Sequence, residues 1–155
     1  MAADAQHPID ALRYASWGRR LAAVAIDAVL LTVVVITTAL AAGVTLEQLN
    51  EELRGEGGIV AVLLFVVPEA VYDTLMIGSR NQTLGKMAMK ITVLDAGDGR
   101  TRIGYPRAFA RWATTNLFLA LWVVPGILDH LWPLRDRRRQ TWHDKLVRSV
   151  VVRTP

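Results

Sequence analysis

Residues 21–43 read LAAVAIDAVLLTVVVITTALAAG, an apolar stretch interrupted by a single acidic residue, Asp27. A helix of this length covers roughly 34 Å, which is enough to cross the hydrocarbon layer of a bilayer. A second apolar stretch, residues 59–77, contains Glu69. A carboxylate at such a depth is costly unless it is paired or protonated. The sequence therefore predicts an all-α membrane protein with a polar interior.

The composition fits a single integral membrane domain that covers residues 1–155. The chain is 52% hydrophobic, carries a formal net charge of +4 and has no cysteine, which excludes disulfides, thiol catalysis and Cys-ligated metal sites. Its basic residues flank the apolar stretches, a pattern typical of a membrane surface rather than of nucleic-acid binding. No signal-peptide pattern follows the polar first twelve residues, so we expect the first apolar stretch to be retained.

Three apolar segments are expected in the membrane, at about 17–43, 58–78 and 108–134. The first two are predicted to be full transmembrane helices, and Pro68 should kink the second because proline removes a backbone hydrogen bond. Pro125-Gly126 splits the third segment. This break favours a broken or re-entrant helix, and a single straight span is the alternative.

Short elements are predicted between and after these segments. The acidic stretch 44–57 has leucines at helical spacing, which predicts a surface helix. Residues 90–94 and 101–103 flank a Gly-Asp-Gly turn, which predicts a small cytoplasmic β-hairpin. The strand-like ending 149–152 could also pair with residues 91–93.

The distribution of charge predicts the topology. Seventeen of the eighteen Lys and Arg residues lie in the N-terminal segment, the loop after the second span, and the tail; only Arg54 lies in the acidic stretch. The positive-inside rule puts those three segments in the cytoplasm. We therefore expect a multi-pass protein of the inner (plasma) membrane with both termini cytoplasmic.

Two buried carboxylates form the main candidate site. Asp27 and Glu69 lie at roughly 10 and 12 Å from the cytoplasmic ends of their helices, so they could meet. Tyr72 and Asp73 follow Glu69 on the same helix face. Two carboxylates in a low dielectric tend to share a proton or hold a cation, which predicts an ion- or proton-binding site. Alternatively, Asp27 pairs with Arg20 and only fixes the packing.

Secondary candidates lie in the last third of the chain. Asp129 and His130 could relay protons, or they could anchor the chain at the interface beside Trp132. His143 lies next to Asp144 in the basic tail, with too few ligands nearby for a metal, and we expect Asp144 to cap a helix or pair with an arginine. No metal or cofactor is expected.

Other features have less specific interpretations. The arginine run 137–139 could contact anionic lipid head groups, or it could simply set the topology. The five tryptophans are interpreted as interface anchors or packing residues. No nucleophile–base pair or metal set is visible, so an enzyme is not expected.

Three segments together resemble the RDD family of membrane proteins, which is named for one arginine and two aspartates. They are residues 14–27 (YASWGRRLAAVAID), 83–93 (TLGKMAMKITV) and 131–152, which begins LWPLRDRRRQTWHDKL. The resemblance extends over nearly the whole chain. It departs at Arg148-Ser149, where the family often has a small-residue pair.

The resemblance implies that Arg20, Asp27 and Asp144 are the residues for which the family is named. It also implies a membrane fold. The family is suspected of transport, without a settled substrate, so the resemblance points to fold more strongly than to activity.

Two functional hypotheses follow. In the first, the protein is a transporter that exchanges a monovalent cation for a proton through Asp27 and Glu69, with Tyr72 and Asp73 lining the cytoplasmic approach. Two spans and a hairpin are too few helices to enclose a transport pathway, so this hypothesis requires a homo-oligomer. In the second, the protein is a non-catalytic accessory or lipid-binding subunit of a larger membrane complex, and Asp27 is structural.

Overall fold

The computed structural model of the chain describes residues 12–54, 62–121 and 123–154. Its elements are, in chain order, α1 (Trp17–Ala41), α2 (Leu46–Arg54), the π-helical turn η2 (Val62–Val66), α4 (Val67–Arg80), α5 (Leu84–Ala88), β1 (Ile91–Asp95), α6 (Gly104–Leu121), α7 (Val123–Leu131), the 3-10 turn η3 (Trp132–Leu134), α8 (Trp142–Leu146) and β2 (Ser149–Arg153). The described part is mostly helical and has one two-stranded sheet, which confirms the predicted helical class.

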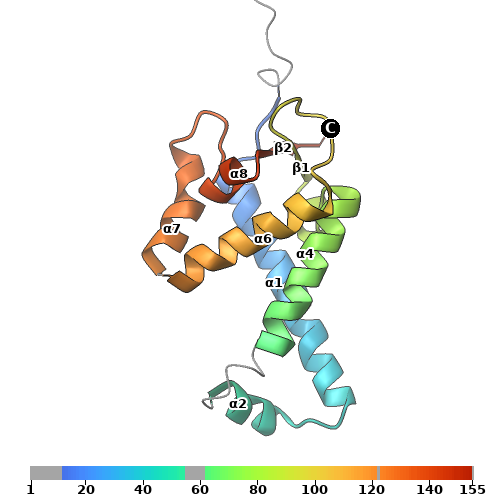
Figure 1. Cartoon of the computed structure of the whole chain (residues 1–155). Coiled ribbons are helices and arrows are strands. Elements are labelled where there is room, and N and C mark those ends of the chain that lie inside the picture. Colours follow the sequence, from blue (N-terminus) through green and yellow to red (C-terminus); the bar gives the residue numbers. More distant parts are fainter. Residues whose placement is uncertain (1–11, 55–61, 122, 155) are drawn as a thin grey trace, which may run out of the picture.

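Helix α1 runs from the end of the molecule that holds the sheet to the end that holds α2 (Figure 1). Ser16 caps its first turn by accepting a hydrogen bond from the backbone amide of Arg19. Leu21, Val29 and Val33 are all more than half exposed. Of the described helices, α1 is the one long and apolar enough to cross a membrane. An apolar surface of this kind is stable against lipid chains rather than water.

Helix α2 confirms the predicted short surface helix. Thr45 and Gln48 form a reciprocal cap, in which each side chain accepts the backbone amide of the other. The helix lies at the end of the molecule opposite the sheet (Figure 1). The acidic segment and the basic segments thus occupy opposite ends.

The second apolar segment changes helix type along its length. A π-helical turn, η2, passes into the regular helix α4 one residue before Pro68. Proline has no amide proton to donate into the preceding turn, and the change from π-helical to α-helical geometry falls next to it. The expected start of this span, residues 58–61, lies outside the described residues. Asn81 ends α4 in the left-handed conformation, with φ of 60°.

The third apolar segment is broken, as predicted, but at a different position. Helix α6 ends at Leu121, helix α7 begins at Val123 and packs against α6, and Pro125-Gly126 lies inside α7. Proline is tolerated there because it falls in the first helical turn. A Cβ on Gly126 would lie 2.4 Å from Cδ2 of Leu119, so this glycine lets the two helices pack closely. The α6–α7 pair brings the tail back toward the sheet (Figure 1).

The sheet joins three segments that are distant in the sequence. Strands β1 and β2 pair antiparallel, with Val93 opposite Val151. The N-terminal segment adds a bridge between Tyr14 and Val152, and the amide of Ala15 donates to the carbonyl of Val151 at 2.9 Å. The predicted alternative, in which the chain ending pairs with residues 91–93, is therefore confirmed.

The predicted hairpin between 90–94 and 101–103 is wrong. The turn forms, since the Asp98 carboxylate accepts the amides of Arg100 and Thr101, but residues 101–103 form no strand. Two backbone hydrogen bonds close the turn, from the Asp95 amide to the Thr101 carbonyl and from the Gly99 amide to the Asp95 carbonyl, and no ladder extends beyond them. Strand β2 offers β1 five consecutive partners and a buried apolar face, which a three-residue strand cannot match.

The core lies where the sheet meets the N-terminal ends of α1 and α6 and the C-terminal end of α4. It consists of small and β-branched side chains that are almost fully buried: Ala15, Ala23, Ile77, Ile91, Val93, Ile103, Ala108 and Val151. These residues come from the N-terminal segment, the middle loop and the tail. The three basic segments are therefore held together at one end of the molecule, which we call the sheet end.

Candidate functional site

Asp27 connects α1 to α4 and α5 through hydrogen bonds. One of its oxygens accepts the Tyr72 hydroxyl at 2.7 Å and the Gly85 amide at 2.7 Å. The other accepts the Thr83 hydroxyl at 2.5 Å. Three donors converge on one carboxylate that is almost entirely buried. Hydrogen bonds from three sides fix the position of this side chain.

The local sequence explains why α5 can approach Asp27 so closely. A Cβ on Gly85 would lie 2.1 Å from the carbonyl oxygen of Ala23 and 2.8 Å from Cγ of Asp27. Thr83 caps α5 by accepting the amide of Lys86 while its hydroxyl proton goes to Asp27. Residues 83–86 (Thr-Leu-Gly-Lys) therefore pack directly against α1.

Asp144 lies at the centre of a charge cluster that joins α1, α6 and α8. Arg20 donates through Nη1 to one carboxylate oxygen at 2.6 Å, and Arg111 donates through Nε to the other at 3.0 Å. Asp144 is fully buried. Burial acts to raise the pKa of this carboxyl, but Arg111 and Arg20 outweigh it and hold the pKa well below its usual 3.8. Asp144 is therefore ionised.

Asp144 also forms the capping box of α8. Thr141 accepts the backbone amide of Asp144, and the Asp144 carboxylate accepts the backbone amide of Thr141. The Ser149 hydroxyl donates to Asp144 at 3.1 Å. Both expectations for this residue, a cap and an arginine pair, are confirmed.

His143 connects this cluster to α7. Its Nδ1 lies 2.6 Å from Asp129, and its Nε2 lies 3.2 Å from Nη2 of Arg111. The guanidinium can only donate, so Nε2 must accept and Nδ1 must carry the proton that goes to Asp129. Burial lowers the pKa of His143, opposed by the hydrogen bond to Asp129. The ring is therefore neutral and serves as a fixed link between Arg111 and Asp129.

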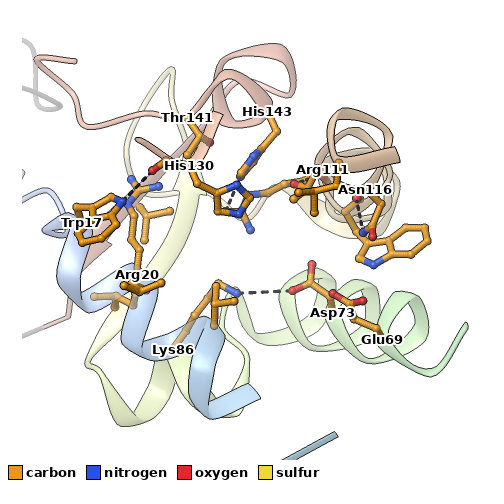
Figure 2. Close-up of a pocket in the computed structure, with 17 residues that line it drawn as sticks. Trp17, Arg20, Glu69, Asp73, Lys86, Arg111, Asn116, His130, Thr141 and His143 are labelled. Carbon is orange, nitrogen blue, oxygen red and sulfur yellow. Dashed lines mark hydrogen bonds and ion pairs between the residues drawn. The ribbon is translucent and has the colours of Figure 1, made fainter. Parts of the chain in front are cut away.

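A cavity of about 240 Å³ lies beside this cluster. It is bordered by α1, α4, α5, α6 and α7, and Figure 2 shows the polar side chains that surround it. Its polar lining consists of Trp17, Arg20, Glu69, Asp73, Lys86, Arg111, Trp112, Thr115, Asn116, His130, Thr141 and His143. The expected secondary candidate His130 is thus part of the lining, and its carbonyl accepts the indole N–H of Trp17 at 2.9 Å.

The acidic side of the cavity is formed by α4. Glu69 and Asp73 lie one turn apart on this helix and both line the cavity, with Glu69 exposed. The buried Lys86 amine lies 3.6 Å from an Asp73 oxygen and 3.3 Å from the Thr83 hydroxyl. Burial lowers the pKa of Lys86, and Asp73 acts against that shift. The carboxylate of Asp73 is therefore the main group that favours the protonated form of Lys86.

Asp27 and Glu69, which the sequence suggested could meet, form no hydrogen bond with each other in the structure. Glu69 lines the cavity with Asp73, whereas Asp27 is not among its lining residues and is held by Tyr72 and α5. The suggested pair of Arg20 with Asp27 is also replaced, because Arg20 pairs with Asp144. Tyr72, expected to line an ion path, instead holds Asp27.

Sequence reasoning missed four residues of this site. Lys86, Thr83 and Gly85 belong to a motif that was noted only as a family likeness, and Arg111 was counted only as one of many basic residues. A signal was present for Arg111, since it lies next to Trp112 at the start of an apolar stretch. Within the described residues, no group of three or more His, Asp or Glu side chains is arranged to hold a metal ion.

Comparison with known proteins gives one clear result. The model of the RDD family matches residues 14–148, which is most of the chain. No curated protein and no solved structure matches it. The matched range includes Arg20, Asp27 and Asp144, the residues around which the charge cluster and the α1–α5 contact are built. The chain therefore belongs to the RDD family of membrane proteins.

Proposed function

We propose that this protein is a transporter that exchanges a monovalent cation for a proton at Glu69, Asp73 and Lys86. The observation that carries the proposal is the buried Lys86 amine, 3.6 Å from Asp73, on the wall of a cavity that Glu69 also lines. Buried ionisable groups that face a cavity in a membrane protein are characteristic of ion pathways.

Charge balance gives the exchange its stoichiometry. With Lys86 protonated, the two carboxylates and the amine sum to −1. A monovalent cation bound between Glu69 and Asp73 repels the Lys86 ammonium and favours loss of its proton. The sum is then again −1. Return of a proton to Lys86 expels the cation, so one cation exchanges for one proton at nearly constant local charge.

In this proposal Asp27 has a structural role. Its oxygens are already engaged by Tyr72, Thr83 and Gly85, which leaves little capacity to bind a cation. The second acid of the exchange site is therefore Asp73, which lies one helical turn from Glu69.

The proposal includes an orientation and an assembly. The sheet end, with its basic segments, faces the cytoplasm of a multi-pass plasma-membrane protein, in line with the positive-inside rule. Glu69 is exposed on a chain with few membrane helices, and an exposed carboxylate is unfavourable against lipid. A homo-oligomer in which a second copy covers this face would provide the missing wall.

The test uses full-length protein reconstituted in liposomes with an imposed pH gradient. Sodium, potassium or lithium is added in turn, and internal pH is followed with a trapped dye. Wild type should collapse the gradient with at least one cation. Glu69→Gln should reduce the initial rate at least about tenfold, because it removes one of the two cation ligands while leaving the Asp73–Lys86 pair intact.

Two further variants sharpen the result. Lys86→Arg keeps the positive charge but cannot release a proton, so it should also abolish exchange. Glu51→Gln makes the same carboxylate-to-amide change on exposed α2, away from the cavity, and should keep the wild-type rate. If folded wild type shows no exchange with any of the three cations, or if Glu69→Gln is as active as wild type, the proposal is wrong. An accessory subunit would then be favoured.

A further inference from the structure

The arginine-rich residues 135–139 follow directly on an exposed apolar face of α7. The outward apolar side chains of this helix recur at the spacing of one helix face, and each is 40% exposed or more: Val124, Ile127, Leu128 and Leu131. Leu134, three residues further on in η3, is 64% exposed. Apolar side chains in such a row are stable against lipid chains rather than water. The chain therefore passes from a lipid-type face straight into a run of cations.

A contact between α7 and α1 gives the depth of this run. The indole N–H of Trp17, the first residue of α1, donates to the carbonyl of His130 at 2.9 Å. The end of α7 therefore lies level with the start of the apolar helix, where lipid head groups and interfacial tryptophans are found. Arg135 follows His130 by five residues. In Figure 1 the loop after α7 arches at the sheet end, on the side of the molecule where α7 lies.

Asp136 ties down the main chain of this loop. Its carboxylate accepts the backbone amides of Arg138 and Gln140 at 3.1 and 3.0 Å, and its carbonyl accepts the amide of Arg139 at 3.0 Å. Arg139 is in the left-handed conformation, with φ of 50°. The Asp136 carboxylate is also paired with Lys145. The one acid of the loop is therefore already engaged, and it does not neutralise the arginines.

The arginines of the loop carry free charge. Their side chains are exposed and form no ion pair within the part of the chain that the structure describes: Arg135, Arg137, Arg138 and Arg139. By contrast, Arg20, Arg107 and Arg111 are each paired with an aspartate. A guanidinium group can bind two phosphate oxygens at once. A loop with four unpaired guanidinium groups at head-group level therefore matches a layer of anionic phosphates.

Apolar side chains border these cations on α8 as well as on η3. Leu146 of α8 is 66% exposed, which is similar to Leu134. The ring of Trp132 packs on Trp142 with 5.2 Å between centroids, and the Lys145 amine lies 5.7 Å from the Trp132 ring. Exposed leucines and a tryptophan beside basic groups are typical of surfaces that dip into the acyl layer while they contact head groups.

We propose that residues 131–139, together with Leu146, form a docking surface for anionic phospholipids. The arginines bind head-group phosphates, and the leucines and Trp132 lie against the acyl chains. A solvated run that only sets the topology would account for the charge, but not for the tied-down loop and its apolar border. The proposal does not rest on cation exchange, and it applies equally to an accessory subunit.

The test measures the lipid selectivity of purified full-length protein in phosphatidylcholine vesicles. Electron paramagnetic resonance separates protein-bound from bulk lipid, with spin-labelled phosphatidylglycerol and spin-labelled phosphatidylcholine compared in turn. Wild type should bind phosphatidylglycerol at least about threefold more strongly, and high salt should weaken this preference. A triple variant, Arg137→Gln with Arg138→Gln and Arg139→Gln, should reduce the preference by at least about half.

A second triple variant separates this surface from net charge. Arg13→Gln, Arg100→Gln and Arg153→Gln remove the same charge from exposed arginines at the sheet and its turn. This variant should keep the wild-type preference, because those side chains lie in other segments of the sheet end.

A single-site probe tests the position of the surface in the bilayer. The chain has no cysteine, so Leu134→Cys can carry one environment-sensitive dye. A lipid with a nitroxide high on its acyl chain should quench this dye. The same dye at Arg100→Cys, in the surface turn, should be quenched much less. Leu134→Cys decides the outcome if the Arg137–Arg139 triple variant does not fold.

The combined outcomes judge the proposal. A preference for phosphatidylglycerol that falls only in the Arg137–Arg139 variant, with quenching at Leu134→Cys, supports it. Equal binding of the two lipids by wild type, or an equal loss in both triple variants, overturns it. A Leu134→Cys dye that the lipid nitroxide does not quench also overturns it, because Leu134 then lies in water or under a second copy of the chain. Cation flux is not part of these readouts, so the exchange proposal is judged separately.

Discussion

Arg20 and Asp144, which are 124 residues apart in the sequence, form a buried ion pair with an N–O distance of 2.6 Å. The pair joins the first turn of α1 to the tail of the chain. Arg111 contacts the other oxygen of Asp144 from α6. One carboxylate therefore links three parts of the chain at the sheet end, in addition to the sheet and the apolar core.

Replacement of this carboxylate should be strongly destabilising. Asp144→Asn keeps the shape of the side chain but leaves Arg20 and Arg111 buried without a counter-charge. Loss of one member of a buried ion pair typically costs about 3–5 kcal/mol. The free energy of unfolding in mixed micelles should fall by this amount. Asp98→Asn, in a surface turn, is the comparison, and an equally small effect of both changes would contradict a central role for Asp144.

Gly85→Ala should disrupt the contact between α1 and α5. The added Cβ would lie 2.1 Å from a backbone oxygen, which cannot move without shifting α1. We expect a loss of about 3 kcal/mol, at the upper end of the range for overpacking. Gly18→Ala is the matched control, because nothing lies within 4 Å of its added Cβ. That variant should be neutral or up to about 1 kcal/mol more stable.

Tyr72→Phe tests whether Asp27 is a structural anchor. The change removes one donor to the Asp27 carboxylate and one acceptor for the Leu84 amide. Hydrogen bonds to charged groups contribute about 1.5–3 kcal/mol, so a loss of that size is expected. Tyr105→Phe, on a half-exposed tyrosine, should change stability by less than about 0.5 kcal/mol. Equal stability of Tyr72→Phe and wild type would show that Asp27 does not depend on this bond.

The sequence predicted those features that depend on local pattern. The apolar run of α1, the surface helix α2 and the existence of a break in the third segment each follow from residues close together in the chain, although the break does not fall at Pro125-Gly126. The failed β-hairpin shows the limit of such reasoning. The turn at residues 96–99 does form, but β1 pairs with β2 because that strand provides a longer and more apolar partner.

The site was only partly predictable for the same reason. Depth along each helix suggested that Asp27 and Glu69 could meet, but depth does not give the rotation of one helix about its axis. The fold of residues 81–88 determines that rotation, because it brings Thr83 and Gly85 against Asp27 and leaves Glu69 at the cavity. The partner of Arg20 depends on the path of the tail, which no local pattern encodes.

Protonation of His143 should destabilise the protein at mildly acidic pH. Burial and the neighbouring Arg111 keep the folded-state pKa of His143 below its usual 6.5. Below pH 6.5 the unfolded chain therefore binds a proton that the folded chain does not, and stability falls as pH falls. The slope contributed by one group is at most about 1.4 kcal/mol per pH unit. Unfolding free energies between pH 7.5 and 5 should fall less in His143→Asn; identical profiles would contradict a neutral, buried ring.

The position of the sheet end relative to the membrane can be determined with two cysteines. The natural chain has none, so Glu51→Cys and Arg137→Cys each provide a unique thiol on an exposed side chain. A membrane-impermeant maleimide should label Glu51→Cys in intact cells and Arg137→Cys only after lysis. Because the sheet ties the N-terminal segment, β1 and β2 together, one probe in the tail reports for all three basic segments. Labelling of Arg137→Cys from outside would reverse the proposed orientation.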